Sequence, residues 1–147
     1  MELDPKTCSF ESDKLSLKLK VTLAAERKAI DQVVQSVMGL VRSMQCAVGK
    51  EDDIELALTE ALANAVVHGA KEDPSKTVEC IVACDEERGM LIVVRDPGAG
   101  FDPASIPNCC HGKNVYSGHG RGIFLINQLM DEVAFHNGGT EIHMIKR

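Results

Sequence analysis

Residues 55–68 read Glu55-Leu-Ala-Leu-Thr-Glu60-Ala-Leu-Ala-Asn64-Ala-Val-Val-His68. Most of these side chains are apolar or small, which is typical of a helix buried in a core. From Leu56 onwards the exceptions are Glu60, Asn64 and His68, which are spaced four residues apart and therefore lie along one side of a helix. The stretch predicts a largely buried helix, from about Glu51 to His68, that carries a single polar stripe.

Signals on both sides bound this helix. Asp52 and Asp53 favour a helix start, because carboxylates stabilise the N-terminal end of the helix dipole. Gly69 fits a C-terminal cap, a position where glycine commonly adopts left-handed backbone angles. Pro74 prevents any continuation beyond it.

The remaining elements follow from periodicity. Met1 to Lys14 is polar and predicts a flexible start, whereas Leu15 to Leu23 alternates apolar and polar residues like a half-buried strand. From Ala24 apolar residues recur at steps of three and four, which predicts a helix closed by Gly49. The other expected elements are a hairpin of strands Thr77–Cys84 and Met90–Val94, a helix Ile123–Met130, and strands Glu132–His136 and Thr140–Ile145 turning at Gly138-Gly139.

The amino-acid composition is typical of one globular domain. The 147 residues are 44% hydrophobic and 26% charged, as in ordinary folded proteins. No apolar run approaches the roughly 20 residues that cross a bilayer, and no secretory signal opens the chain, so we expect a cytoplasmic protein without membrane contact. A net charge of −6 without a basic, aromatic stripe argues against direct nucleic-acid binding. The six cysteines are expected to be reduced thiols.

The polar stripe has two interpretations. It is either the solvent-facing side of an amphipathic helix or a ligand site. Asn64 favours the second, because asparagine costs a helix about half a kcal/mol and a ligand would offset that cost. Mg²⁺ takes one or two oxygen ligands from protein and the rest from phosphates and water, so Asn64 can hold the ion. Glu60 can then accept a proton from an attacking hydroxyl, and His68 is interpreted as a capping or packing residue.

A first glycine-containing loop, Arg95-Asp96-Pro97-Gly98-Ala99-Gly100-Phe101-Asp102, directly follows a predicted strand. The Asp96 carboxylate can accept a hydrogen bond from the exocyclic amine of adenine, and Gly98 and Gly100 allow close backbone approach. A tight turn capped by Asp96 is the alternative.

A second glycine-rich loop, Ser117-Gly118-His119-Gly120-Arg121-Gly122-Ile123, precedes a predicted helix. Such a loop can present backbone N–H groups and the positive end of the helix dipole to phosphates. The whole stretch from Asp96 to Gly122 holds six glycines and three prolines, which predicts a functional loop. The phosphate-loop motif is missing, and a Rossmann motif is disfavoured because no obvious strand precedes the glycines.

Taken in order, Glu60-x-x-x-Asn64, Asp96-x-Gly98-x-Gly100 and Gly118-x-Gly120-x-Gly122 resemble the N, G1 and G2 boxes of the GHKL ATPase superfamily. Within it, Asn64-Ala-x-x-His68-Gly69 and Gly120-Arg-Gly-Ile-Phe-Leu resemble the anti-sigma factor serine/threonine kinases. The resemblance covers residues 15–147 and implies an α+β Bergerat fold. That fold is a two-layer sandwich with a mixed, mostly antiparallel sheet, helices on one face, and a nucleotide lid around Pro103 to Gly118.

The resemblance also implies roles and partners. Glu60 would be the base that activates a target serine or threonine, Asn64 would bind Mg²⁺, and Asp96 would bind the adenine of ATP. The implied cofactor-binding residues are Asn64, Asp96, Gly98, Gly100, Phe101, Gly118, His119, Gly120, Arg121 and Gly122. The implied partners are a STAS-domain antagonist, a sigma factor and a second copy of the chain.

Two other functions are compatible with the same boxes. One is a non-catalytic switch that binds ATP to change its shape for a partner. The other is a detached histidine-kinase catalytic domain, which ranks last because the short segment before Leu15 cannot supply a helical phosphoacceptor.

The cysteines add no expected site. Cys109-Cys110-His111 in the expected lid departs from the family, but adjacent cysteines rarely ligate one tetrahedral metal, so no metal site is expected there. Cys80 and Cys84 share a strand face and are interpreted as core residues.

Overall fold

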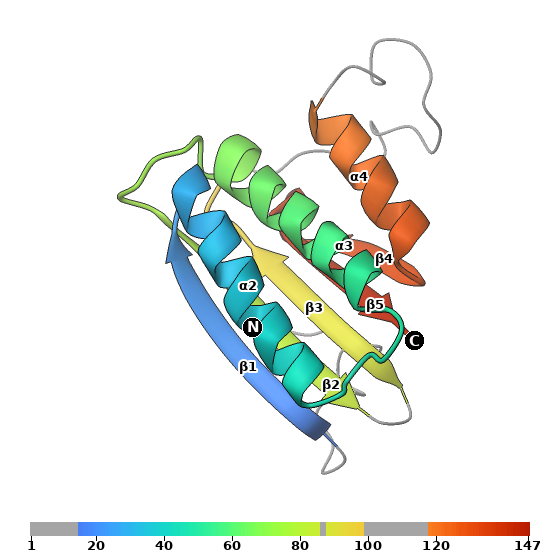
Figure 1. Cartoon of the computed structure of the whole chain (residues 1–147). Helices are drawn as coiled ribbons and strands as arrows, with labels where there is room; N and C mark the ends of the chain where they lie inside the picture. Colours follow the sequence, from blue (N-terminus) through green and yellow to red (C-terminus); the bar gives the residue numbers. More distant parts are fainter. Residues whose placement is uncertain (1–14, 86–87, 99–117) are drawn as a thin grey trace.

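The computed structural model describes residues 15–85, 88–98 and 118–147, which form a sheet covered on one face by helices (Figure 1). The strands are β1 (Leu15–Ala24), β2 (Thr77–Asp85), β3 (Gly89–Arg95), β4 (Glu132–His136) and β5 (Glu141–Lys146). They lie in the order β1-β2-β3-β5-β4. Every pairing between these described strands is antiparallel, so the parallel part of the expected mixed sheet is not found among them.

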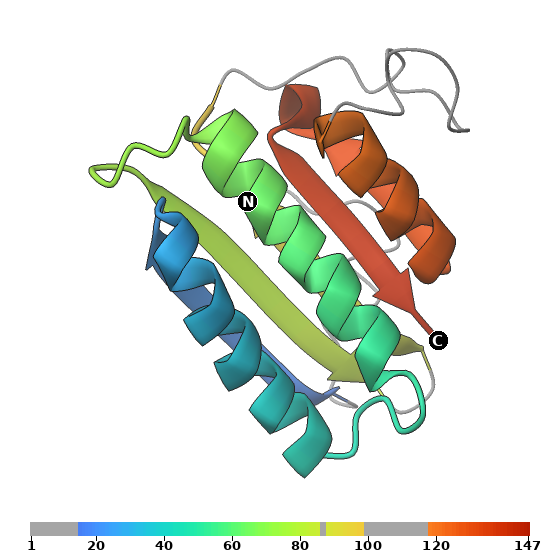
Figure 2. The ribbon, with the colours of Figure 1, turned by 45° about the horizontal axis from the view of Figure 1, so that its top comes forward.

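The helices α2 (Arg27–Ser43), α3 (Glu51–Asn64) and α4 (Gly118–Leu129) run side by side over one face of the sheet (Figures 1 and 2). α3 lies between α2 and α4 and contacts both. A π-helical turn, η1 (Ala65–Gly69), continues α3, and a 3₁₀ turn, η4 (Asn137–Gly139), joins β4 to β5. The predicted two-layer α+β class with helices on one face is therefore confirmed.

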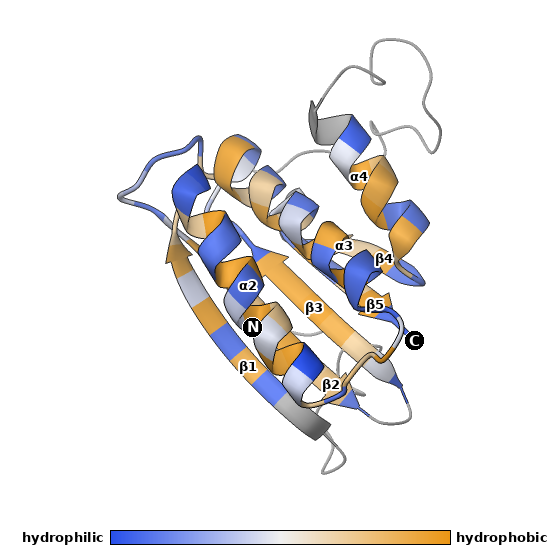
Figure 3. Cartoon of the chain, viewed as in Figure 1, coloured by the Kyte–Doolittle hydropathy of each residue, from blue (hydrophilic) through white to orange (hydrophobic). Residues whose placement is uncertain are grey.

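The core lies between the two layers. α3 buries Ile54, Leu58 and Leu62 completely, and β3 contributes Met90 and Ile92 from the opposite layer. The apolar character of β3 beneath the helices is visible in Figure 3. The strand and helix periodicities of the sequence thus point the expected side chains inward. No helix in the described part of the chain is long and apolar enough to cross a membrane.

Several element boundaries differ from the predictions, most of them by one residue. α2 ends at Ser43, and Gly49, with a φ of 85°, lies in the connection just before α3 instead of closing α2. α4 begins at Gly118, five residues before the predicted start at Ile123, because the low helix propensity of glycine is overridden by packing against α3. β5 begins one residue late, at Glu141, because Thr140 belongs to the turn.

A pair of leucines on α3 tests the packing. Leu58 is fully buried, whereas Leu56 is 42% exposed. Leu58→Ala should lower the free energy of unfolding by about 2–5 kcal/mol, because a cavity is left in a closely packed core. Leu56→Ala should change it by less than about 0.5 kcal/mol. Urea denaturation measures both values, and equal losses would contradict this arrangement of α3.

Candidate functional site

The polar stripe passes from α3 into a π-helical turn. Asn64 is the last residue of α3, and the Ala70 N–H donates to the Ala65 carbonyl at 2.8 Å across the wider turn. Lys71 and Glu72 then adopt left-handed φ angles of 58° and 55° and end the helical path. Such π-turns occur frequently at functional sites because they displace side chains from regular helical positions.

Asn64 and His68 line two cavities. The first, the inner cavity, has a volume of about 240 Å³ and lies between the helices and the end of the sheet. Its walls include the apolar side chains of Val94, Ile123, Phe135 and Ile142, with Asp96 and Thr140 as polar groups. An apolar chamber with a few placed polar groups is typical of a site for a planar ligand.

Among the described residues, those that line the second, the outer cavity, belong to the helical layer. Glu60, Asn64 and His68 contribute from one side, and Arg121 and Gly122 contribute from α4. The three residues of the predicted stripe therefore face one common space. Asn64 and His68 line both cavities, and each cavity combines apolar with charged or polar side chains, so a ligand that occupied both would pass these two residues.

Asp96 lies at the end of β3 and points into the inner cavity. Its Oδ1 accepts a hydrogen bond from the Gly98 N–H at 2.7 Å, and its own N–H donates to the Thr140 carbonyl at 2.9 Å. Burial raises the pKa of the Asp96 carboxyl, and the Gly98 hydrogen bond partly opposes this. With Oδ1 accepting from Gly98, the carboxylate keeps Oδ2 as a further acceptor.

Two glycines permit Asp96 to approach α3. A Cβ added at Gly69 would lie 2.2 Å from the Asp96 Cγ, and one at Gly98 would lie 2.2 Å from the Gly69 carbonyl oxygen. Gly69 is the last residue of η1 and does not adopt a left-handed φ, so the C-terminal cap predicted at Gly69 falls one residue later, at Ala70. The glycine is needed because the Asp96 carboxylate occupies the place of a side chain.

A third glycine joins α4 to the stripe. A Cβ added at Gly122 would lie 2.9 Å from Glu60 Oε2 and 3.4 Å from Asn64 Nδ2. Gly122 is buried, and the neighbouring Arg121 is exposed at the edge of the outer cavity. The close approach of the Gly122 backbone thus brings the Glu60 carboxylate, the Asn64 amide and the first turns of α4 together.

An ion pair borders the outer cavity near His68. Arg27, at the start of α2, donates from Nε to Glu72 Oε1 at 2.6 Å and from Nη2 to Glu72 Oε2 at 3.3 Å. Burial lowers the pKa of His68, and the charges of Lys71 and Arg27 lower it further. His68 is exposed and borders both cavities, so its predicted role as a capping or packing residue at the helix end stays a prediction.

The predicted residues fall into three groups. Glu60, Asn64, Asp96, Gly98, Arg121 and Gly122 surround the cavities or pack against residues that do. Gly118, His119 and Gly120 form the first turn of α4, where unpaired N–H groups can face phosphates. Gly100, Phe101, Cys109-Cys110-His111 and the expected lid up to Ser117 lie outside the described residues.

Sequence reasoning missed Thr140. It lines the inner cavity and accepts the hydrogen bond from the Asp96 N–H. Its only sequence signal is its place directly after the Gly138-Gly139 turn, which becomes informative once β5 is known to lie beside β3.

The described cysteines are free thiols, and Cys80 and Cys84 are buried core residues as predicted. Burial raises the pKa of the Cys80 thiol to about 12, which makes it a poor nucleophile. Within the described residues, no group of three or more His, Cys, Asp or Glu side chains is arranged to hold a metal ion. A metal in the outer cavity would therefore depend on Asn64, its neighbours and ligand oxygens.

The antiparallel sheet with helices on one face fits an ATPase domain of the histidine kinase-like class, and the chain belongs to the family of histidine kinase-like ATPase domains, which it matches over residues 23–146. It is similar to the serine-protein kinase RsbW of Bacillus cereus (strain G9842), with 28% identity over 137 residues, 88% of this chain and 83% of the relative. The serine-protein kinase RsbW of Bacillus subtilis (strain 168) is 27% identical over 135 residues, 87% and 84% of the two chains. The resemblance based on the three boxes is confirmed.

Gly69→Ala tests the contact with Asp96. The added methyl group should displace the carboxylate and weaken ATP binding about tenfold or more, seen as a smaller rise in melting temperature on adding Mg²⁺-ATP. Gly39→Ala is the control, because no atom lies within 4 Å of its added Cβ. The control should keep ATP binding and gain about 0.5–1 kcal/mol of stability. An unchanged ATP response in Gly69→Ala would refute the contact.

Asp96→Asn tests the buried carboxyl. Because the folded-state pKa is raised, ionised Asp96 destabilises the fold above that pKa, and the penalty disappears as pH falls towards the ordinary value of 3.8. The variant should therefore have a higher free energy of unfolding than wild type at pH 7, and the difference should shrink in acid. Urea denaturation at several pH values measures it. A difference that grows in acid would contradict the raised pKa.

Proposed function

We propose that this chain is a cytoplasmic, ATP-binding anti-sigma factor with serine/threonine kinase activity towards a STAS-domain antagonist. One observation carries the proposal: the close contact of Gly122 with Glu60 and Asn64 places an acid, an amide and the start of α4 around one cavity. These are the groups that phosphoryl transfer requires, namely a base, a ligand for a metal and donors for phosphates. The similarity to serine-protein kinases supports the same reaction class.

In this proposal the inner cavity receives adenine. The apolar side chains of Val94, Phe135 and Ile142 would contact the ring, and Asp96 Oδ2 would accept from its exocyclic amine. Gly98 and Gly69 hold that carboxylate against the end of α3. Gly100 and Phe101 complete the proposed set on the same loop.

The outer cavity receives the phosphates. The backbone N–H groups of Gly118, His119 and Gly120 begin α4, and Arg121 and Gly122 follow at the cavity wall. A helix N-terminus favours anions because its first N–H groups are unpaired and the dipole is positive there. The guanidinium of Arg121 adds a positive charge at the same place.

The donor set of the outer cavity fits Mg²⁺. The Asn64 amide oxygen is a hard ligand, and the ion would take its other ligands from phosphates and water. When bound, Mg²⁺ neutralises charge that develops on the transferred phosphoryl group. Glu60, one helical turn from Asn64, would accept the proton of the incoming serine or threonine hydroxyl at Oε2.

The partners belong to the proposal as well. A STAS-domain protein would supply the hydroxyl, and a sigma factor would be held while that antagonist is phosphorylated. We also propose that the working form is a homodimer. These partners follow from the resemblance to the anti-sigma factor kinases.

Phosphate transfer to a STAS-domain antagonist tests the function. With labelled ATP, Glu60→Gln should reduce transfer by about 100-fold or more while ATP affinity stays within about twofold. Asn64→Ala should lose the Mg²⁺-dependent part of thermal stabilisation, which for wild type is about 2.7 kcal/mol at one hundred times the dissociation constant.

Each outcome points to one conclusion. Full transfer by Glu60→Gln would exclude Glu60 as the base. Stabilisation by ATP without transfer to any STAS partner would favour a non-catalytic ATP switch. No stabilisation of the wild type at millimolar Mg²⁺-ATP would refute the nucleotide site itself.

A further inference from the structure

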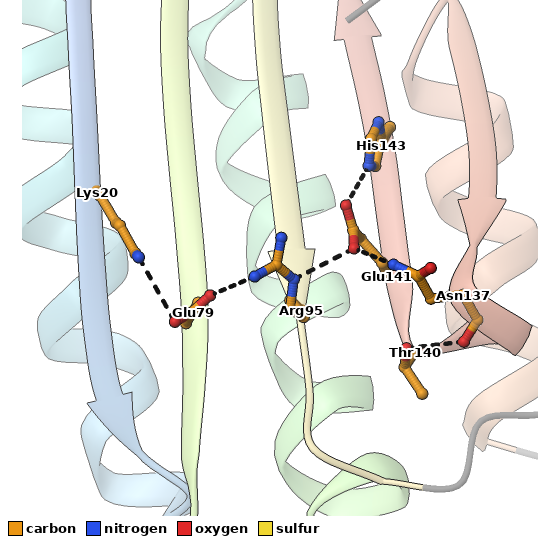
Figure 4. A network of polar contacts seen from close by, with 7 residues as sticks. All are labelled: Lys20, Glu79, Arg95, Asn137, Thr140, Glu141 and His143. Carbon is orange, nitrogen blue, oxygen red and sulfur yellow. Dashed lines mark hydrogen bonds and ion pairs between the residues drawn. The ribbon is translucent and has the colours of Figure 1, made fainter. Parts of the chain in front are cut away.

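The face of the sheet opposite the helices carries a chain of charged side chains that crosses four strands (Figure 4). Lys20 on β1 pairs with Glu79 on β2 at 3.5 Å, and Arg95 on β3 donates to Glu79 at 2.9 Å. From its Nε, Arg95 also donates to Glu141 on β5 at 3.2 Å. The chain of contacts therefore runs from an exposed edge of the sheet to a buried carboxylate.

Glu141 is the centre of this network. Its side chain is fully buried, and besides Arg95 it accepts from Asn137 Nδ2 at 2.7 Å and contacts His143 Nε2 at 2.7 Å. Burial by itself would raise the pKa of Glu141, but the His143 contact, the Arg95 charge and the Asn137 hydrogen bond together hold it below its ordinary value. A buried carboxylate of this kind is stable only while its partners stay in place.

The network is attached to the inner cavity through the backbone. Arg95 directly precedes Asp96, and Glu141 directly follows Thr140. The hydrogen bond from the Asp96 N–H to the Thr140 carbonyl joins these two neighbours at 2.9 Å. The cavity-lining residues and the ion-pair residues thus alternate along the same two chain segments. The first set faces one side of the sheet and the second set faces the other.

Asn137 connects the turn before β5 to Glu141 by a hydrogen bond. Its backbone has a left-handed φ of 54°, and its side chain is held by Glu141. Thr140 Oγ1 donates to the Asn137 carbonyl at 2.9 Å, which closes the turn. Gly139 and Thr140, which line the inner cavity, are therefore positioned by a turn that depends on Glu141.

We propose that Glu141 is a positioning residue for base recognition: with Arg95 and Asn137 it holds Asp96 and Thr140 in the geometry that distinguishes adenine from other bases. The inference rests on the proposed ATP site and adds a residue on the far side of the sheet to it. Hydrogen-bonded recognition requires placement within about 0.5 Å, which depends on supporting contacts behind the recognising group. Without the Glu141 charge, the ion pair with Arg95 is lost and the hydrogen bonds from Arg95 and Asn137 to the same oxygen are weaker, so the two chain segments can shift.

Comparison of two nucleotides tests this proposal. Dissociation constants for Mg²⁺-ATP and Mg²⁺-ITP are measured by calorimetry, because inosine carries a carbonyl where adenine carries the amine that Asp96 accepts. Wild type should prefer ATP. Glu141→Gln keeps the shape of the side chain and should reduce the ITP-to-ATP ratio of dissociation constants on the order of tenfold. A general loss of stability would weaken both nucleotides alike and leave the ratio unchanged.

Two further variants complete the test. Glu132→Gln is the matched control, since Glu132 pairs with Arg147 on the neighbouring strand and does not line the inner cavity; its ratio should equal that of wild type. Asn137→Gly removes one Glu141 partner while tolerating the left-handed φ. It should also reduce the ITP-to-ATP ratio of dissociation constants, and it serves as the test if Glu141→Gln does not fold.

The outcomes separate this inference from the proposed function. If wild type prefers ATP but Glu141→Gln, or Asn137→Gly in its place, keeps the full preference, the positioning role is overturned and the ATP site stands. If wild type binds neither nucleotide, or binds both equally, the proposed adenine site fails and the positioning role fails with it.

Discussion

The burial of α3 between two other helices and the sheet is the constraint on which the site depends. Ile54, Leu58 and Leu62 pack this helix against the core. Its polar stripe therefore faces the inner and outer cavities. A stripe on a freely exposed helix would be hydrated and adaptable. Here Glu60 and Asn64 are held by the packing of the whole domain, which is how a fold preorganises a site.

Glycine then decides how closely the other elements approach that helix. Gly69 admits the Asp96 carboxylate, and Gly122 admits the start of α4 against Glu60 and Asn64. Neither glycine has a left-handed φ; each is required by the space that another residue occupies. The charged network behind the sheet acts at longer range, because Arg95 and Glu141 are joined by the backbone to residues that line the inner cavity.

The limits of prediction can be seen in particular residues. The helix from Glu51, the hairpin of β2 and β3, and the turn at Gly138-Gly139 were predicted because each has a local periodicity or turn signal. The start of α4 was placed too late because three glycines argued against a helix, and only packing against α3 reversed that preference. Thr140 had only its place after the Gly138-Gly139 turn as a signal, and Glu141 had none, since their importance comes from the hydrogen bond to Asp96 and from strand pairing with Arg95.

The sequence by itself determined most of the secondary-structure elements, the polar stripe and the order of the three boxes, because these depend on periodicity and on residues near one another along the chain. The class of fold followed from the family resemblance that the three boxes carry. Tertiary structure alone decided that the stripe borders two cavities and that Gly69 makes room for Asp96. It also decided that a buried ion network supports the cavity from the far side of the sheet. Those features depend on contacts between residues far apart in the chain, which local pattern cannot specify.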